Sequence, residues 1–341
     1  MAKVLTVGNI VVDLIVKPEK DLPKWGRLCQ VDLPITPHIG GNGAIFAAFM
    51  AGLIKDCAIV GFIGEDMFGD WLLAELEKVK VDTSAIKRTK GNTSATAVLV
   101  DRDARRAFLH HIGPNEKVDL DSIPGDFMGA RWLHLASVFI LPGLPPKSCT
   151  TLLRKAKEAG LYTSVDLVWD PSEKWDMDKM AGFADVLFLN QEEGEAVTGT
   201  NAPLEILDMM ATMGPKITVL KMGDAGCAVK LQSGETFFAP SFEVKAVDST
   251  GAGDAFNAGF VYGLLNVVDN AKGGRKKKGK SKDQAKDILD LADMQTLKKV
   301  ALMGNALGAI SVTQMGGVTE PPSQRALLDF VRTQKKRMAV D

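Results

Sequence analysis

The sequence is poor in cysteine, and this excludes two kinds of small stabilised fold. Its 341 residues include only four, with no C-x-x-C pair among them: Cys29, Cys57, Cys149 and Cys227. This spacing provides neither a zinc-ligand set nor a disulfide framework. Buried, reduced thiols are the ordinary state of such residues in a reducing compartment. We therefore expect a cytoplasmic protein with free cysteines.

Long hydrophobic runs and an excess of either charge are also lacking. The longest apolar stretch, residues 44–54, is too short to cross a bilayer. Asn9 and Asp13 interrupt the apolar start of the chain, which predicts a strand rather than a signal peptide. Lys and Arg number 41 and Asp and Glu 42, for a net charge of −1. We therefore expect no membrane partner and no general coating of nucleic acid.

The charge is nonetheless unevenly distributed. Residues 272–286 hold eight Lys or Arg and one Asp, so this segment carries +7 and the rest of the chain −8. Residues 274–281 match the P-loop pattern G-x-x-x-x-G-K-[ST], but residues 268–273 lack the apolar strand that must precede a P-loop. A run of like charges is typical of a solvated loop. We expect a basic insertion at about residues 270–290, with a contact to RNA or acidic proteins as an alternative role.

The order of predicted elements indicates an α/β fold. Strands and helices alternate at residues 132–140, 146–159, 161–167, 186–189, 204–213 and 217–221. This alternation implies a parallel sheet covered by helices on both faces. Short strands at 227–231 and 236–239 predict an antiparallel edge, and residues 93–100 and 106–112 predict a hairpin.

Residues 248–256, Asp-Ser-Thr-Gly-Ala-Gly-Asp-Ala-Phe, place glycines and a carboxylate at the start of a predicted helix. The amides of Gly251, Ala252 and Gly253 can approach an anion closely at a helix N-terminus. Asp254 can accept a proton from an attacking hydroxyl while these amides hold the developing negative charge. The alternative for Asp254 is an acidic residue that only complements the helix dipole.

This segment resembles the D-T-x-G-A-G-D-x-F signature of the ribokinase (PfkB-type) carbohydrate kinases. Residues 40–44, Gly-Gly-Asn-Gly-Ala, resemble the family's N-terminal glycine pair, and residues 190–193 match its N-x-x-E motif. The resemblance covers about residues 3–330. It implies one domain, residues 1–341, with a three-layer α/β/α fold and a mostly parallel central sheet. A small β-sheet lid is expected from about residues 12–37 and 93–112.

The resemblance implies ATP-dependent phosphorylation of a hydroxyl, which we expect to be primary, on a small sugar or sugar-like alcohol. Asp254 would be the base and the amides of residues 251–253 the anion hole. Asn190 and Glu193 would organise Mg²⁺ indirectly, although Glu193 also fits a first-turn helix carboxylate. The remaining residues of the ATP site would be Lys221, Gly223, Gly226, Thr250 and Asn305.

Two further sites follow from the resemblance. A monovalent cation, K⁺, would lie beside the anion hole, held by Asp248, Thr250, Ser311, Gln314 and Gly316. The sugar would be bound by Asp13, Gly41 and Asn42, and from the lid by His111 and Asn115. Ile45 replaces a polar position of the family, so the pocket is expected to be less polar than a ribose site. The substrate therefore stays open among sugars, nucleosides and keto-sugar acids, and two lids are expected to join in a homodimer.

Two other classes of function compete with this one. A P-loop NTPase would use Lys280 and Ser281, and a non-catalytic sensor would keep the kinase fold without its chemistry. The presence of Asp254, Asn190 and Glu193 together favours a catalytic protein.

Overall fold

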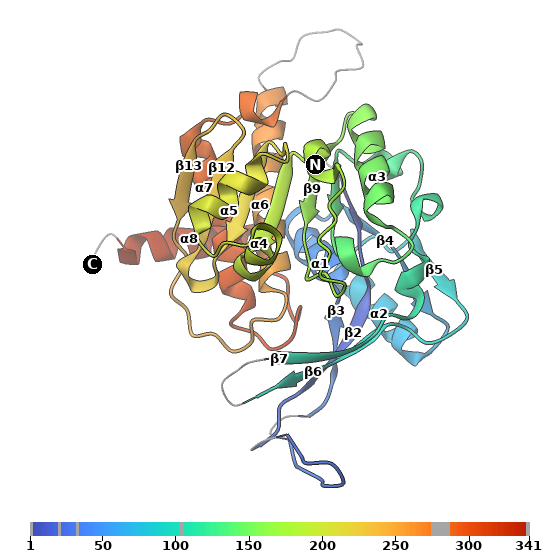
Figure 1. Ribbon diagram of the computed structural model, residues 1–341. Coiled ribbons are helices and arrows are strands. Elements are labelled where there is room, and N and C mark those ends of the chain that lie inside the picture. Colours follow the sequence, from blue (N-terminus) through green and yellow to red (C-terminus); the bar gives the residue numbers. More distant parts are fainter. Residues whose placement is uncertain (1–2, 20–21, 32–33, 102–105, 274–286, 339–341) are drawn as a thin grey trace.

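A nine-stranded sheet forms the centre of the molecule (Figure 1). The computed structural model describes residues 3–19, 22–31, 34–101, 106–273 and 287–338. In spatial order the strands are β13 (Thr236–Ala239), β12 (Cys227–Leu231), β11 (Ile217–Lys221), β10 (Val186–Asn190), β9 (Tyr162–Asp166), β8 (Trp132–Leu135), β1 (Val4–Val7), β4 (Cys57–Gly64) and β5 (Ile86–Thr89). Neighbours from β11 to β5 pair in parallel, and β12 and β13 pair antiparallel. The predicted parallel sheet and its antiparallel edge are both confirmed.

Helices cover the two faces of this sheet, because successive strand residues point to opposite sides. On β8, for example, Trp132 belongs to one apolar core and Leu133 to the other. The first core is completed by α1 (Asn42–Ile54), α2 (Met67–Lys78), α6 (Ala252–Gly273), α7 (Met294–Ser311) and α8 (Gln324–Met338). The second is completed by α3 (Pro146–Glu158), α4 (Gln191–Thr198) and α5 (Pro203–Ala211). Short 3-10 helices lie at Gly113–Lys117, Leu120–Ser122, Phe127–Gly129, Val138–Ile140, Met180–Phe183, Gly223–Ala225 and Ile288–Asp290.

A second, four-stranded sheet projects from one end of the body, at the bottom of Figure 1. Its order is β3 (Pro37–Gly40), β2 (Val11–Val16), β6 (Ala95–Val100) and β7 (Arg106–His111). Strands β6 and β7 pair antiparallel, so the predicted hairpin is confirmed, although its turn at residues 102–105 lies outside the described residues. All six residues of β7 are exposed. We call this sheet the lid sheet.

Three elements differ from the sequence-based expectation. The strand expected over residues 132–140 ends at Leu135, because Ser137 takes a left-handed backbone (φ 63°) and a 3-10 helix follows. The sequence also predicts an extended stretch at residues 242–247, but these residues form no strand. It predicts a helix over residues 252–265, but α6 runs on to Gly273. Most of the basic insertion, residues 274–286, lies outside the described residues.

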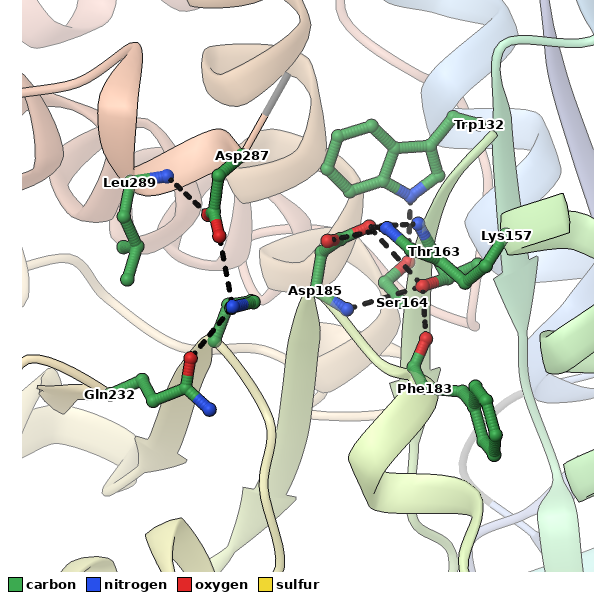
Figure 2. Close-up of polar contacts among 10 residues, drawn as sticks. Trp132, Lys157, Thr163, Ser164, Phe183, Asp185, Gln232, Asp287 and Leu289 are labelled. Carbon is green, nitrogen blue, oxygen red and sulfur yellow. Dashed lines mark hydrogen bonds and ion pairs between the residues drawn. The ribbon is translucent and has the colours of Figure 1, made fainter. Parts of the chain in front are cut away.

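A polar cluster fixes the amino ends of the central strands (Figure 2). The buried carboxylate of Asp185, just before β10, accepts hydrogen bonds from Lys157 Nζ at 2.7 and 2.8 Å and from the Thr163 backbone amide at 2.8 Å. At the same edge Asp287 pairs with Lys216, and Asp269 near the end of α6 pairs with Arg131. Both flanks of the basic insertion are therefore tied to the edge of the sheet where the strands begin.

Candidate active site

Polar side chains follow the central strands at the opposite edge, where the strands end. Asn9 comes soon after β1 and Ser137 soon after β8. Asp166, Asn190 and Lys221 are the last residues of β9, β10 and β11. The carboxyl ends of parallel strands meet at one edge, which is where α/β proteins bind ligands. This edge is our candidate active site.

The first residue of α1 contacts the first turn of α6 at this edge. Asn42 Nδ2 donates to Asp254 Oδ1 at 3.1 Å and to Oδ2 at 3.4 Å. Ser137 Oγ donates to Asn9 Oδ1 at 2.6 Å and lies 3.4 Å from Asn42 Oδ1. The carboxylate of Asp254 is therefore held by a chain of side chains from three elements.

Burial changes the acid strength of Asp254. The residue is only 4% exposed, and its pKa is well above the ordinary aspartate value, first because of burial and then because of the nearby Asp166 charge. Asn42 and Lys221 act in the opposite direction by favouring the charged form. A carboxylate with a raised pKa is a stronger proton acceptor than an exposed one.

The turn before α6 offers unpaired backbone donors. Gly251 has φ 73°, and a Cβ there would lie 2.9 Å from the Gly317 carbonyl oxygen, so only glycine fits. The Ala252 amide donates to the Ser249 carbonyl oxygen at 3.3 Å. The amides of Gly251 and Gly253 have no hydrogen-bond partner among the described residues. Two free amides at a helix N-terminus form a favourable site for an anion.

A buried cluster of charges lies beneath this turn. Lys221 Nζ is 2.7 Å from Asp166 Oδ1, and the two side chains are 13% and 3% exposed. Burial works to lower the pKa of Lys221, but the Asp166 and Glu193 carboxylates outweigh it and raise that pKa overall. A Cβ at Gly253 would lie 3.3 Å from Lys221 Nζ, so the ammonium group is adjacent to the turn.

Asn190 and Glu193 form a reciprocal cap at the start of α4. The Glu193 amide donates to Asn190 Oδ1 and the Asn190 amide to Glu193 Oε2, both at 2.8 Å. Burial raises the pKa of Glu193 to about 8, against the opposing effect of Lys221. The expectation that Glu193 is a first-turn helix carboxylate is therefore met, next to the buried charge cluster.

Asp248 connects the two loops expected to hold a monovalent cation. Its Oδ1 accepts hydrogen bonds from the Thr250 amide and hydroxyl at 2.9 and 2.8 Å, and its Oδ2 accepts from the Gly316 amide at 2.9 Å. The side chain of Gln314 turns away, to the backbone of Glu320. Ser311, the last residue of α7, is buried and donates its hydroxyl to the Gly308 carbonyl.

The residues expected to bind a sugar differ in their exposure to solvent. Asp13 on β2 is 7% exposed, and burial raises its pKa to about 7 despite a hydrogen bond to Thr96. Gly41 has φ 85° and packs on the Asn9 carbonyl. His111 is exposed on β7. Asn115 is fully buried, and its amide bonds the backbone of Ile10 at 3.0 Å, so it joins the segment after the lid sheet to the start of β2.

The residues near β12 that are expected to bind the nucleotide also have structural roles in the fold. Gly226 has φ 94°, and a Cβ there would lie 2.2 Å from the Ala239 carbonyl oxygen. Gly223 starts the 3-10 helix before it. Asn305 on α7 donates to the Ala239 and Pro240 carbonyls at 2.9 Å each and is 4% exposed. Asn305 is therefore not a solvated residue of the helix surface, since its amide ties α7 to the end of β13.

Three residues of this site were not predicted from the sequence: Asn9, Ser137 and Asp166. The signal that could have found them is position: each lies at or just beyond the carboxyl end of a predicted parallel strand.

None of the helices that the structure describes has the length and apolar character of a membrane span.

Comparisons with known proteins show the family and the fold of the chain. The model of the pfkB family of carbohydrate kinases matches residues 1–324. A fructokinase of Klebsiella pneumoniae is 32% identical over 283 residues, 79% of this chain and 87% of its own. Ribokinase of Giardia lamblia superposes with TM-score 0.79 at 20% identity over 96% of this chain and 99% of its own. A double mutant of Vibrio cholerae fructokinase, bound to fructose, ADP and potassium ion, gives TM-score 0.73 at 25% identity over 97% of this chain and 98% of its own. The expected ribokinase-like fold is confirmed, and the chain belongs to the pfkB family of carbohydrate kinases, phosphotransferases with an alcohol as acceptor.

Proposed function

We propose that Asp254 is the base that accepts the proton of the substrate hydroxyl when it attacks the γ-phosphorus of ATP. The observation that carries this proposal is the position of a buried carboxylate in the same helix turn as two unpaired amides. The amides of Gly251 and Gly253 stabilise charge on the transferring group, and Ala252 holds the turn closed. Lys221, beneath the turn, balances part of the added negative charge.

Mg²⁺ would be held mainly by phosphate oxygens and water. Among the described residues, no group of three His, Cys, Asp or Glu side chains could hold a metal ion by itself. Mg²⁺ commonly binds through one or two carboxylates together with substrate phosphates. Asn190 and the buried Glu193 fit the role of orienting such water molecules, so the residues present suit this ion.

A monovalent cation beside the turn is the second ligand that we propose. Asp248 supplies a carboxylate between Thr250 and Gly316. The backbone carbonyls of Ser311, at the end of α7, and of Gln314 belong to the segment that leads to Gly316. A fructokinase relative binds potassium ion, which supports this proposal. The measurement that tests it is the rate with K⁺, Na⁺ or a large organic cation as the only monovalent cation.

We propose that the acceptor is a small sugar or sugar-like alcohol that contacts Asp13, Asn42 and Gly41 beneath the lid sheet. Asp13 is about half protonated at pH 7, because burial raises its pKa to about 7. His111, exposed on β7, would contact this substrate from the lid sheet, and Asn115 would hold the lid sheet in place through its bond to Ile10. Ile45 packs against the turn at Gly251 and would make this side of the acceptor site apolar.

A coupled assay of ADP release tests this function. The panel contains fructose, ribose, nucleosides and keto-sugar acids, each with ATP and Mg²⁺. On the best substrate, Asp254→Asn is expected to lower kcat by about 10²–10⁴. The matched control is Asp70→Asn, which removes another first-turn helix carboxylate, on α2. Near-full turnover of Asp254→Asn would show that Asp254 only complements the helix dipole.

The lid sheet also suggests how two chains associate. Phe108 and Leu109 are 56% and 66% exposed on β7, an edge strand. Exposed apolar edges favour pairing with another chain. We propose a homodimer through the lid sheets, tested by sedimentation of Leu109→Asp. Leu204→Asp, at a leucine on α5 that is 51% exposed, is the control that should keep the wild-type state. A Leu109→Asp variant that sediments like the wild type would contradict a homodimer through the lid sheets.

A further inference from the structure

Two fully buried side chains on the α6 side of the central sheet carry polar atoms that have no hydrogen-bond partner among the described residues. His134 is the third residue of β8 and Asn257 lies in α6, and both are 0% exposed. Nε2 of His134 and both amide atoms of Asn257 are unpaired. A buried polar group without a partner destabilises a fold, and internal water commonly satisfies such groups.

The neighbours of His134 determine which of its ring nitrogens carries the proton. Trp132 Nε1 can only donate, and it donates to Ser164 Oγ at 2.8 Å (Figure 2). The single hydroxyl proton of Ser164 is then directed to His134 Nδ1, which is also 2.8 Å away. Burial lowers the pKa of His134 to about 3, so the ring is neutral at pH 7 and its proton lies on Nε2. Nε2 is consequently a donor that needs an acceptor.

Ring contacts bring His134 close to the part of α6 that carries Asn257. The His134 ring stacks on Phe46 of α1 with 3.7 Å between the ring centroids, and it lies 6.4 Å from the Phe188 ring of β10. Phe188 in turn lies 5.4 Å from Phe260, which follows Asn257 by one turn of α6. His134 and Asn257 therefore belong to one region, enclosed by β8, α1 and α6.

The face of α6 that carries Asn257 points into this region. Gly253 faces the sheet, since a Cβ there would lie 3.3 Å from Lys221 Nζ, and Asp254 faces α1, since it accepts from Asn42. At 3.6 residues per turn, Asn257 lies between these two directions, about 40° from Gly253 and about 60° from Asp254 around the helix axis. Its amide is therefore directed to the junction of the sheet and α1, one turn deeper than Asp254.

We infer that an internal water molecule lies between His134 Nε2 and the Asn257 amide, and that these two residues position Asp254 through it. The water accepts from Nε2–H and bonds the amide, which offers both a donor and an acceptor. It thereby ties α6 to β8 about 4.5 Å along the helix axis from Asp254. The water site stands on the fold alone, whereas its effect on turnover rests on the proposed role of Asp254 as the base.

A tie at this depth matters because Asp254 and the unpaired amide of Gly253 both belong to the first turn of α6. Their distance from the acceptor hydroxyl depends on how the helix lies on the sheet. A displacement of about 1 Å in a reacting group can cost about 10²-fold in rate. Hydrogen bonds restrict distance and direction more narrowly than the surrounding apolar contacts do. His134 and Asn257 are therefore positioning residues, which act on the reaction only through Asp254 and its helix.

A crystal structure of the wild-type protein that shows ordered water tests the site directly. We expect a water within about 2.7–3.2 Å of His134 Nε2 and of one amide atom of Asn257. The imidazole nitrogens of His134, observed by nitrogen-15 NMR at pH 7, should show the proton on Nε2. A direct hydrogen bond between the two side chains, an empty gap between them, or a proton on Nδ1 would each overturn the inference.

Kinetics of Asn257→Leu, His134→Phe and the double variant test the positioning role. We expect each single variant to lower kcat by about tenfold or more, while the affinity for ADP stays within about threefold of the wild type. Because both changes remove the same water, the double variant should be within about twofold of the slower single variant. Thr218→Val is the matched control, since its buried hydroxyl is also unpaired among the described residues but lies on the other face of the sheet, with Leu220.

Unchanged kcat in both single variants, or effects that multiply in the double variant, would overturn the positioning role. Where a variant does not fold, the crystal structure of the wild type still decides whether the water is present. A wild-type protein that turns over no acceptor would overturn the proposed function and the positioning role with it. The same crystal structure would then decide the water site by itself.

Discussion

Asn42 and Asp254 link the starts of two helices that are 212 residues apart in sequence, through a hydrogen bond of 3.1 Å from Nδ2 to Oδ1. Asn42 favours the charged form of the carboxylate and so lowers its pKa, against the raising effect of burial. The same contact that positions the proposed base therefore also sets the pH range in which it can accept a proton.

Removing this contact should move the pH dependence of catalysis. Asn42→Leu takes away a donor that stabilises the carboxylate, so the pKa of Asp254 rises further. The acidic limb of kcat/KM, which follows deprotonation of the free base, should then shift to higher pH. The profile between pH 5 and 9 measures this, with Asn201→Leu at an exposed loop position as control. A limb that stays in place would argue against Asp254 as the titrating group.

Lys221 is expected to be essential for stability as well as for turnover. Lys221→Met leaves Asp166 buried without its partner, and removing one member of a buried ion pair commonly costs about 3–5 kcal/mol. Urea unfolding measures this loss. The double variant Lys221→Met/Asp166→Asn should regain most of the stability but not the kcat, because the positive charge near the turn stays absent. Recovery of both would assign the pair a purely structural role.

Asp13 should make the protein less stable as the pH rises. Its pKa is about 7 when folded, against an ordinary value of 3.8, so the folded chain holds a proton that the unfolded chain releases. Stability therefore falls between about pH 4 and pH 7, and the full cost persists above pH 7. Asp13→Asn should stabilise the protein at pH 8 by on the order of 2–4 kcal/mol and weaken acceptor binding.

Thermal unfolding of Asp13→Asn and wild type from pH 4 to pH 8 checks that sign. The difference should be small at pH 4 and largest at pH 8. Asp208→Asn, at an exposed position on α5, is the control. A difference that grows toward acid pH would mean that Asp13 is stabilised in its charged form.

Deleting residues 274–282 should leave phosphotransfer intact. Helix α6 begins at the anion-binding turn and has 22 residues, which makes it about 33 Å long at 1.5 Å per residue. The segment with the P-loop pattern follows the far end of this helix. Turnover in the coupled assay is expected to stay within about twofold of the wild type. Abolished turnover would favour the P-loop function through Lys280 and Ser281. Salt-dependent binding of RNA that disappears with the deletion would assign the segment a separate role.

Local sequence patterns were sufficient for much of the fold and for the central motif. The strands Cys227–Leu231 and Thr236–Ala239 form with the predicted bounds, and the motif at residues 248–256 does open a helix at the carboxyl edge of the sheet. These features depend on near neighbours in sequence, such as alternating apolar residues and glycines at a turn.

Features that depend on distant contacts were not predictable in the same way. Strand β8 ends at Leu135 rather than at residue 140, and the Ser137 hydroxyl just beyond it donates to Asn9, which lies between β1 and β2 and is 128 residues away in sequence. In the sequence Asp166 is an ordinary residue at the end of a strand, and only the fold brings Lys221 next to it. A buried asparagine such as Asn115 has no local signature, since its partners, the Ile10 backbone and the Ser94 hydroxyl, belong to other segments.

Helix α6 runs from the proposed active site to the point where the basic insertion follows in the chain. At its far end Asp269 is held by Arg131, and beyond the insertion Asp287 is held by Lys216. Because these pairs keep both flanks on the body, chain length between them can vary at a small cost in loop-closure entropy. The protein can therefore accept a tag, a tether or a whole inserted module at this point, while the turn that binds the phosphoryl group keeps its geometry.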